Sequence, residues 1–217
     1  MKKTEKLLFI GDSITESGRF EDSEGIGFGY VRLIRDFLQV TFPDQTPVII
    51  NRGISGNHIT DLVTRWDRDV IEADPDYLSI SIGINDVWRR LDHPEKDLVY
   101  PDQYEEIYRS LIEEVQSKTK AAIILMEPSI HGEDVRSRGN EMLVPYAETV
   151  QKLACEYKAI LVPAHQAFIE YLNHHGPANL TTDGVHMTSA GNMLLAKTWV
   201  RAFLSNEVNN RLECRRF

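Results

Sequence analysis

A glycine-aspartate-serine sequence near the start of the chain carries the clearest chemical signal. Gly11, Asp12 and Ser13 directly follow an apolar run that ends at Ile10. An apolar run stopped by a glycine is typical of a buried strand that ends in a tight turn. Open α/β folds place their active sites at the carboxyl ends of such strands. The pattern therefore predicts that the Ser13 hydroxyl stands where a nucleophile would act, while Asp12 holds the turn.

A histidine that could act as the base for this serine lies late in the chain. A serine hydroxyl is a weak nucleophile near neutral pH and requires an adjacent proton acceptor. The sequence Asp183-Gly184-Val185-His186 precedes the last amphipathic segment. His186 can take the serine proton, and Asp183 in the same turn can orient the imidazole and stabilise the imidazolium. We therefore predict a Ser13–His186–Asp183 triad without a metal ion.

Two further glycine turns supply candidate oxyanion donors. Gly53 follows the apolar run that ends near Asn51, and Asn85 follows Gly83 after another apolar run. Attack on an acyl carbon creates an oxyanion that preorganised N–H groups must stabilise. We predict that the backbone N–H groups of Ser13 and Gly53 and the side-chain amide of Asn85 form this set. Glycine at position 53 also allows the backbone to approach a ligand closely.

Short apolar runs alternate with amphipathic segments along the whole chain, which predicts one α/β domain over residues 1–217. Alternating strands and helices imply parallel pairing with helices on both faces of a sheet. We expect a flavodoxin-like three-layer α/β/α sandwich with a five-stranded parallel sheet in the order 2-1-3-4-5. The expected strands are Lys6–Ile10, Val48–Ile50, Tyr77–Ile82, Ala121–Met126 and Ala159–Val162.

The four sequence blocks together resemble those of the SGNH hydrolases, also called GDSL-type esterases. The resemblance runs from about Leu7 to Gly191 and implies a flavodoxin-like acyl hydrolase that uses no cofactor. It implies that Ser13 is the nucleophile and an oxyanion donor, Gly53 and Asn85 the other donors, and His186 and Asp183 the base and its orienter. The chain departs from the commonest family pattern at Met187, where a proline often follows the histidine.

A finer resemblance concerns the segments Asn51–Asn57 and Ile82–Arg89, which are similar to those of bacterial acetylxylan esterases. Those enzymes are intracellular, act on acetylated xylo-oligosaccharides and tend to form oligomers, so the resemblance implies a homo-oligomer with a small acylated sugar as substrate. Within the pocket, the Trp88 indole could stack on a pyranose, while Arg89 and His58 could reach its hydroxyls. His58 could equally face solvent.

Composition limits the partners. The chain of 217 residues has 24 basic and 33 acidic residues and a net charge of −9, which argues against nucleic acid and anionic membranes as partners. No apolar run approaches the roughly 18 residues of a membrane span. The apolar run after the N-terminal lysines is too short for a signal peptide, so we expect a cytoplasmic protein. Cys155 falls in a helical pattern and is expected to be a small buried hydrophobe.

Other functions remain possible at this level. A lysophospholipase- or thioesterase-like acyl hydrolase would share the triad but accept longer or different acyl donors. A two-metal phosphoesterase would use Gly11-Asp12 and Gly56-Asn57-His58, but the chain lacks the Asp-x-His and Gly-His-x-His sequences that supply further ligands. A non-catalytic carbohydrate-binding module is the third alternative. The polar stretch Glu127–Glu141 follows an expected strand and is expected to be a functional loop.

Overall fold

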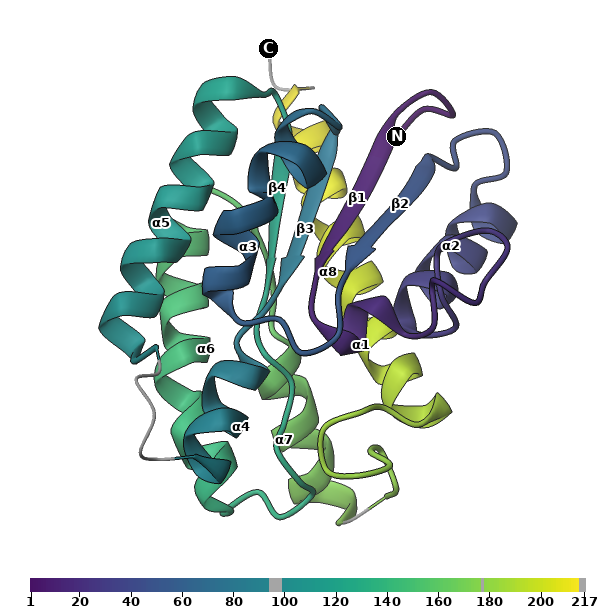
Figure 1. Ribbon diagram of the computed structural model, residues 1–217. Coiled ribbons are helices and arrows are strands. Elements are labelled where there is room, and N and C mark those ends of the chain that lie inside the picture. The colour runs from purple at the N-terminus through teal and green to yellow at the C-terminus, as the bar shows by residue number, and fades with distance from the viewer. Residues whose placement is uncertain (94–98, 177, 215–217) are drawn as a thin grey trace.

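The computed structural model describes residues 1–93, 99–176 and 178–214, with side chains as far as residue 206. Its centre is a five-stranded sheet in the predicted order β2-β1-β3-β4-β5, and all neighbouring strands are parallel (Figure 1). The strands are β1 (Lys6–Gly11), β2 (Val48–Gly53), β3 (Tyr77–Ser81), β4 (Ala122–Met126) and β5 (Ile160–Val162).

Helices cover both faces of the sheet, which explains why its central strands are apolar on both sides. In Figure 1, α2 (Tyr30–Thr41) and α8 (Ser189–Cys214) lie on one face. The helices α3 (Ile59–Trp66), α5 (Pro101–Lys118) and α6 (Arg138–Glu156) lie on the other. The remaining elements are α1 (Ser13–Glu16), a turn of π-helix η1 (Asp67–Ile71), α4 (Ile84–Asp92) and α7 (Ala164–His175).

The core joins α8 to the middle of the sheet. The Trp199 ring of α8 lies 5.5 Å from the Phe9 ring of β1 and stacks on Phe203 at 5.0 Å. Its indole Nε1 donates a hydrogen bond of 3.0 Å to the buried Ser79 Oγ on β3. This hydrogen bond gives each of the two buried polar side chains a partner. Trp66, at the end of α3, is also buried.

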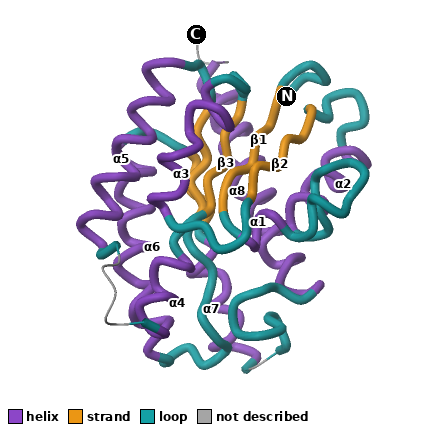
Figure 2. Tube along the Cα trace, in the orientation of Figure 1, coloured by secondary structure: helices purple, strands orange, loops and turns teal. Residues whose placement is uncertain are grey.

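The carboxyl ends of the strands point to one edge of the sheet. Figures 1 and 2 show α1, α4 and the loop before α8 gathered below this edge, while the N-terminus lies at the opposite end. Every block that the sequence singles out follows one of these strands or lies in that loop. The fold therefore brings the candidate residues to a common region.

Three features differ from the sequence expectation. β2 continues three residues beyond Ile50, because Asn51, Arg52 and Gly53 pair with the end of β1. The short helices α1 and α4 were not evident as apolar stripes. The prediction for Cys155 is wrong: its side chain is exposed, since it lies on the opposite side of α6 from the buried Leu153. Within the described residues, no helix combines the length and apolarity that crossing a membrane requires.

Candidate active site

The nucleophile turn is built by Asp12. This residue is the N-cap of α1, and its Oδ1 accepts a hydrogen bond of 2.9 Å from the Ile14 N–H. The cap places Ser13 in the first turn of the helix, directly after β1. Asp12 is buried, and burial raises the pKa of its carboxyl to about 7 despite the hydrogen bond from Ile14. Asp12 therefore holds the turn, as the sequence predicts.

The structure assembles the predicted triad. The His186 Nε2 lies 2.9 Å from the Ser13 Oγ, and the His186 Nδ1 lies 2.6 Å from the Asp183 Oδ2. The other Asp183 oxygen accepts the backbone N–H groups of Val185 and His186 at 3.0 and 2.8 Å. Burial raises the pKa of Asp183, but the hydrogen bonds from His186 and these N–H groups outweigh it and hold the pKa at about 2. Asp183 is thus a carboxylate at neutral pH, as an orienter of the base requires.

The loop after β4 supports the base turn. The Glu133 carboxylate accepts backbone N–H groups from Ala178 and Thr181 at 2.7 and 3.0 Å. The Gly132 N–H donates to the Gly184 carbonyl, which lies in the turn between Asp183 and His186, at 2.6 Å. The predicted functional loop, Glu127–Glu141, therefore supports the turn that carries His186. Its last residues form the start of α6. An antiparallel bridge between Thr181 and Met187 closes the turn without a proline at position 187.

Two of the three predicted oxyanion donors are available for a ligand. The Ser13 N–H stands in the first turn of α1, where helical N–H groups have no partner within the helix. The Asn85 Nδ2 donates to the Asn57 carbonyl at 3.0 Å, which leaves its second hydrogen for a ligand. The Gly53 N–H already donates to the Asn51 Oδ1 at 2.8 Å. Its role as an oxyanion donor stays a prediction, which requires that this N–H also bind the oxyanion or leave Asn51.

Glycine is required at two positions of this region. A Cβ at Gly53 would lie 2.2 Å from the Glu16 backbone nitrogen, so only glycine allows α1 to pack against the end of β2. Gly83 has a φ of 120°, a conformation that side chains other than glycine rarely adopt. This turn directs the chain from β3 into α4 and thereby sets the position of Asn85.

One buried arginine connects the segments that carry these donors. The Arg65 guanidinium donates to the backbone carbonyls of Gly11 and Arg52, at 3.1 and 2.7 Å. Its Nε donates to the Asn57 Oδ1 at 2.9 Å, and the Asn57 backbone carbonyl in turn accepts the Asn85 amide. Asp69 balances the charge at 2.8 Å. The planar fork of arginine suits this set of acceptors. Sequence reasoning missed this role, because the acceptors lie far apart in the chain.

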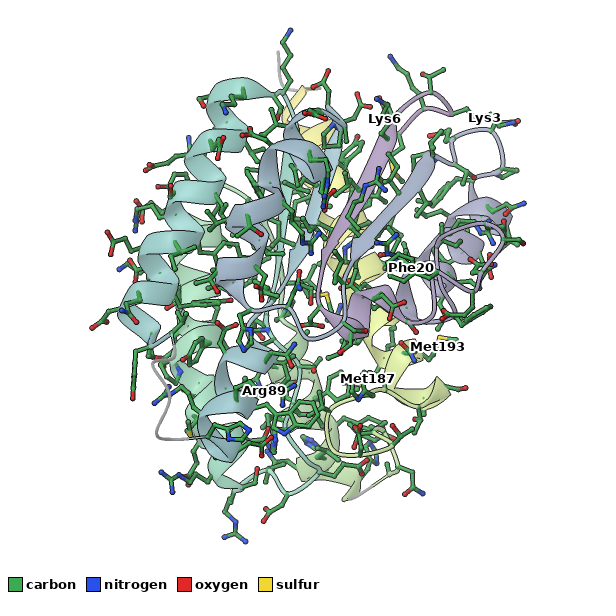
Figure 3. The ribbon with its side chains drawn as sticks, viewed as in Figure 1. Lys3, Lys6, Phe20, Arg89, Met187 and Met193 are labelled. Atoms are coloured by element: carbon green, nitrogen blue, oxygen red, sulfur yellow. The ribbon has the colours of Figure 1, made fainter. Side chains whose placement is uncertain are left out.

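The predicted substrate-binding residues lie in different surroundings. Trp88 is beside the base, with ring centroids 6.1 Å from His186 and 6.3 Å from His131. The Arg89 guanidinium, on a residue that Figure 3 labels, lies 5.3 Å from the Trp88 ring centroid. The His58 ring turns toward its own helix, where its Nδ1 lies 3.2 Å from the Asp61 Oδ2. Among the described residues the His58 Nε2 is buried without a hydrogen-bond partner.

A cavity of about 190 Å³ opens beside the nucleophile and the base. Sequence reasoning assigned no binding role to six residues of its wall. Glu16 stands three residues after Ser13, a spacing that places both side chains on one side of a helical turn, so this signal was present. The lining residues are Ser13, Ile14, Glu16, Ser17, Ser55, His186, Met187 and Asn192, of which Met187 is labelled in Figure 3.

Another buried carboxyl lies behind the site. The Asp86 oxygens accept the Ile59 N–H at 3.3 and 3.4 Å, so Asp86, a residue of α4, also serves the first turn of α3. Burial raises its pKa to about 7, and the nearby Asp12 acts in the same direction. Over the side chains that the structure describes, no group of three or more histidine, cysteine, aspartate or glutamate residues is placed to hold a metal ion.

A serine in contact with a histidine, which is itself held by a carboxylate, defines a serine hydrolase on a doubly wound α/β fold. Residues 9–194 match the GDSL-like lipase/acylhydrolase family, and the chain belongs to that family. It is similar to the acetylxylan esterase of Geobacillus stearothermophilus, with 42% identity over 204 residues that cover 91% of this chain and 93% of that protein.

Solved structures agree with this assignment. The crystal structure of Axe2, an acetylxylan esterase from Geobacillus stearothermophilus, has a TM-score of 0.86 and 40% identity, and the match covers 93% of this chain and 96% of that one. LAE5, an alpha/beta hydrolase from the metagenome of Lake Arreo in Spain, also reaches 0.86, with 33% identity and the same coverage. Catalytic mutants of Axe2 replace a serine, an aspartate or a histidine, which fits a Ser-His-Asp triad. The chain is thus a carboxylic ester hydrolase.

Proposed function

We propose that this hydrolase removes O-acetyl groups from xylo-oligosaccharides. The observation that carries the proposal is the contact of 2.9 Å between the His186 Nε2 and the Ser13 Oγ, at the mouth of a small polar cavity. The similarity to acetylxylan esterases supports the sugar as the alcohol part of the ester. A neutral sugar ester also suits a chain with a net charge of −9.

The geometry leads to a two-step acyl transfer. His186 takes the Ser13 proton as the serine oxygen attacks the acetyl carbonyl, and the carbonyl oxygen becomes an oxyanion held by the Ser13 N–H and the Asn85 amide. The C–O bond to the sugar then breaks, His186 gives its proton to the sugar oxygen, and acetyl-Ser13 remains. Water, deprotonated by His186, attacks this ester and releases acetate and the free serine. Asp183 stabilises the imidazolium in both steps.

The surroundings of the nucleophile favour a short acyl group. A methylene gains about 0.8 kcal/mol only where apolar surface can cover it. The cavity beside Ser13 has a volume of about 190 Å³, below the range of about 300–1,000 Å³ that is usual for small-molecule sites, and a carboxylate, two hydroxyls and an amide stand in its wall. A long acyl chain that entered this cavity in place of the alcohol would therefore find little apolar surface there.

The test compares acyl chain lengths and leaving groups. We expect kcat/KM to fall from 4-nitrophenyl acetate to butyrate to octanoate, and we expect acetate release from acetylated xylose and xylo-oligosaccharides in the presence of a metal chelator. Ser13→Ala should lower kcat by roughly 10⁶ if the triad acts as a unit, with the circular dichroism spectrum unchanged. Rates that rise toward octanoate would identify a lysophospholipase- or thioesterase-like enzyme, and activity lost to chelation would favour the metal enzyme.

Three further properties stay predictions. Localisation in the cytoplasm, the homo-oligomer and the exclusion of nucleic acid rest on the sequence arguments and the resemblance given above. Sedimentation analysis of the purified chain would measure its oligomeric state.

A further inference from the structure

The cavity beside Ser13 faces the part of the ester that leaves. The departing oxygen must receive its proton from the His186 Nε2, so the alcohol lies on the side of the serine that His186 shares. Ser13 and His186 both line the cavity, whereas Gly53, Asn85 and Trp88 do not. The acetyl oxygen is therefore held outside this cavity, by the Asn85 amide, and the alcohol is directed into it.

Glu16 and Ser55 form the polar wall of this cavity. The Ser55 Oγ donates a hydrogen bond of 2.9 Å to the Glu16 Oε2. The Glu16 Oε1 has no hydrogen-bond partner within the described residues, and the Ser55 oxygen keeps its lone pairs for a donor. A carboxylate oxygen of this kind is a strong acceptor for a hydroxyl group. The wall thus presents acceptors at the place where the alcohol stands.

The backbone fixes Glu16 in this position. Glu16 is the last residue of α1, and its N–H donates to the Asp12 carbonyl at 2.9 Å. The next residue, Ser17, has a φ of 41° and turns the chain away from the helix. The Gly53 backbone packs against Glu16 from the other side, and the Gly53 carbonyl accepts the Arg19 Nε at 2.7 Å. Glu16 therefore stands at a constant offset from the nucleophile, as a residue that selects a substrate must.

We propose that Glu16, supported by Ser55, binds a ring hydroxyl next to the acetylated position of the sugar. This proposal rests on the proposed function, since it names the subsite that recognises the sugar. The ligand class is a neutral pyranose with a free hydroxyl beside the ester. A leaving group without a hydroxyl donor would gain nothing from the carboxylate, and an anionic one would be repelled.

The experiment measures the ratio of kcat/KM for mono-acetylated xylose to kcat/KM for 4-nitrophenyl acetate. Glu16→Gln should lower this ratio about 10- to 100-fold, because it removes the charge from the acceptor. Ser55→Ala should lower it less. Glu21→Gln is the matched control: it removes an exposed carboxylate five residues away and should leave the ratio unchanged. A deoxy analogue that lacks the neighbouring hydroxyl should be a poorer substrate for the unsubstituted enzyme and should respond little to Glu16→Gln.

Two results would overturn the proposal separately from the function. Equal losses on the sugar ester and the aryl ester would leave the ratio unchanged and show that Glu16 acts on the chemistry or the fold. Unchanged rates on both esters would show that Glu16 does not bind the sugar. If the unsubstituted enzyme cleaves aryl acetate but releases no acetate from acetylated xylose, the proposed function fails and this subsite fails with it.

Discussion

At the scale of single residues, Arg65 shows how a buried charge can organise a catalytic site that it does not enter. Its guanidinium contacts the chain two residues before Ser13, one residue before Gly53, and Asn57, whose carbonyl holds Asn85. The segments that bear all three candidate oxyanion donors are therefore tied to one group. Because preorganisation of such donors supplies much of the rate, a shift in these segments should appear in kcat.

Replacement of this arginine tests the argument. Arg65→Lys keeps the charge but cannot reach acceptors in several segments at once, so we expect kcat on 4-nitrophenyl acetate to fall at least about 10-fold with little change in KM. Asn85→Ala, which removes the donor itself, should cost about 10²–10³ in kcat. The neighbouring Arg68 also binds Asp69 but is largely exposed, so Arg68→Lys is the control. A lower melting temperature with kcat unchanged would limit Arg65 to a structural role.

At the scale of elements, the strands and their order could be predicted because a buried parallel strand requires a continuous apolar run. Helix α1 could not, since four residues are too few for an apolar stripe to repeat. Apolar residues at helical spacing also include Phe37, Val63 and Met193, yet the structure exposes these side chains by 39, 51 and 55%. Helical spacing shows which residues share a face, but the width of the buried stripe depends on the neighbouring element.

The triad could be predicted from its sequence blocks, and the contacts that hold the blocks together could not. Asp86 accepts a hydrogen bond from Ile59, which begins another helix 27 residues earlier in the chain. Likewise, the support that Glu133 gives to the base turn crosses about 45 residues. Such contacts depend on how the loops of different strands meet at the sheet edge. The spacing of residues within one segment does not predict these contacts.

The buried carboxyls at these junctions predict a pH-dependent stability. Asp12 and Asp86 have ordinary pKa values near 3.8 when exposed and values of about 7 in the folded chain. Between those values the folded state binds more protons than the unfolded state, so their contribution to stability is present at low pH and is lost as the pH rises toward 7. Asp86→Asn should remove part of this dependence, since asparagine carries no charge to bury.

Urea unfolding at pH 5.5 and pH 8 would measure this effect. The unsubstituted protein should lose more unfolding free energy between the two pH values than Asp86→Asn does. Titration of the histidines is common to both proteins and cancels in the difference. Asp44→Asn serves as the control, because the Asp44 side chain is almost fully exposed. Identical losses in all three proteins would show that Asp86 is not protonated in the folded state at pH 5.5.

At the scale of the whole molecule, the charge of the chain and the chemistry of the site act in the same direction. The chain has a net charge of −9. The wall of the cavity contains Glu16, and His186, which also lines it, contacts the Asp183 carboxylate. Arg19 and Arg89, which follow Ser13 and Asn85 in the sequence, both stack on aromatic rings. An acyl donor that carries several negative charges must therefore approach against a repulsive field.

This field separates the sugar esterase from a thioesterase-like alternative. We expect kcat/KM for acetyl-coenzyme A, a polyanionic thioester, to be low at 10 mM salt and to rise between 10 and 300 mM, because the screening length shortens from about 30 Å to below 10 Å. For neutral acetylated xylose, kcat/KM should change little over the same range, since no net charge is brought to the site. Glu16→Gln should raise the rate with the polyanion at low salt, while Glu21→Gln, which alters the net charge equally, should raise it less. If kcat/KM for acetyl-coenzyme A instead falls as salt is added, local basic groups attract the polyanion despite the net charge. The thioesterase hypothesis would then be preferred.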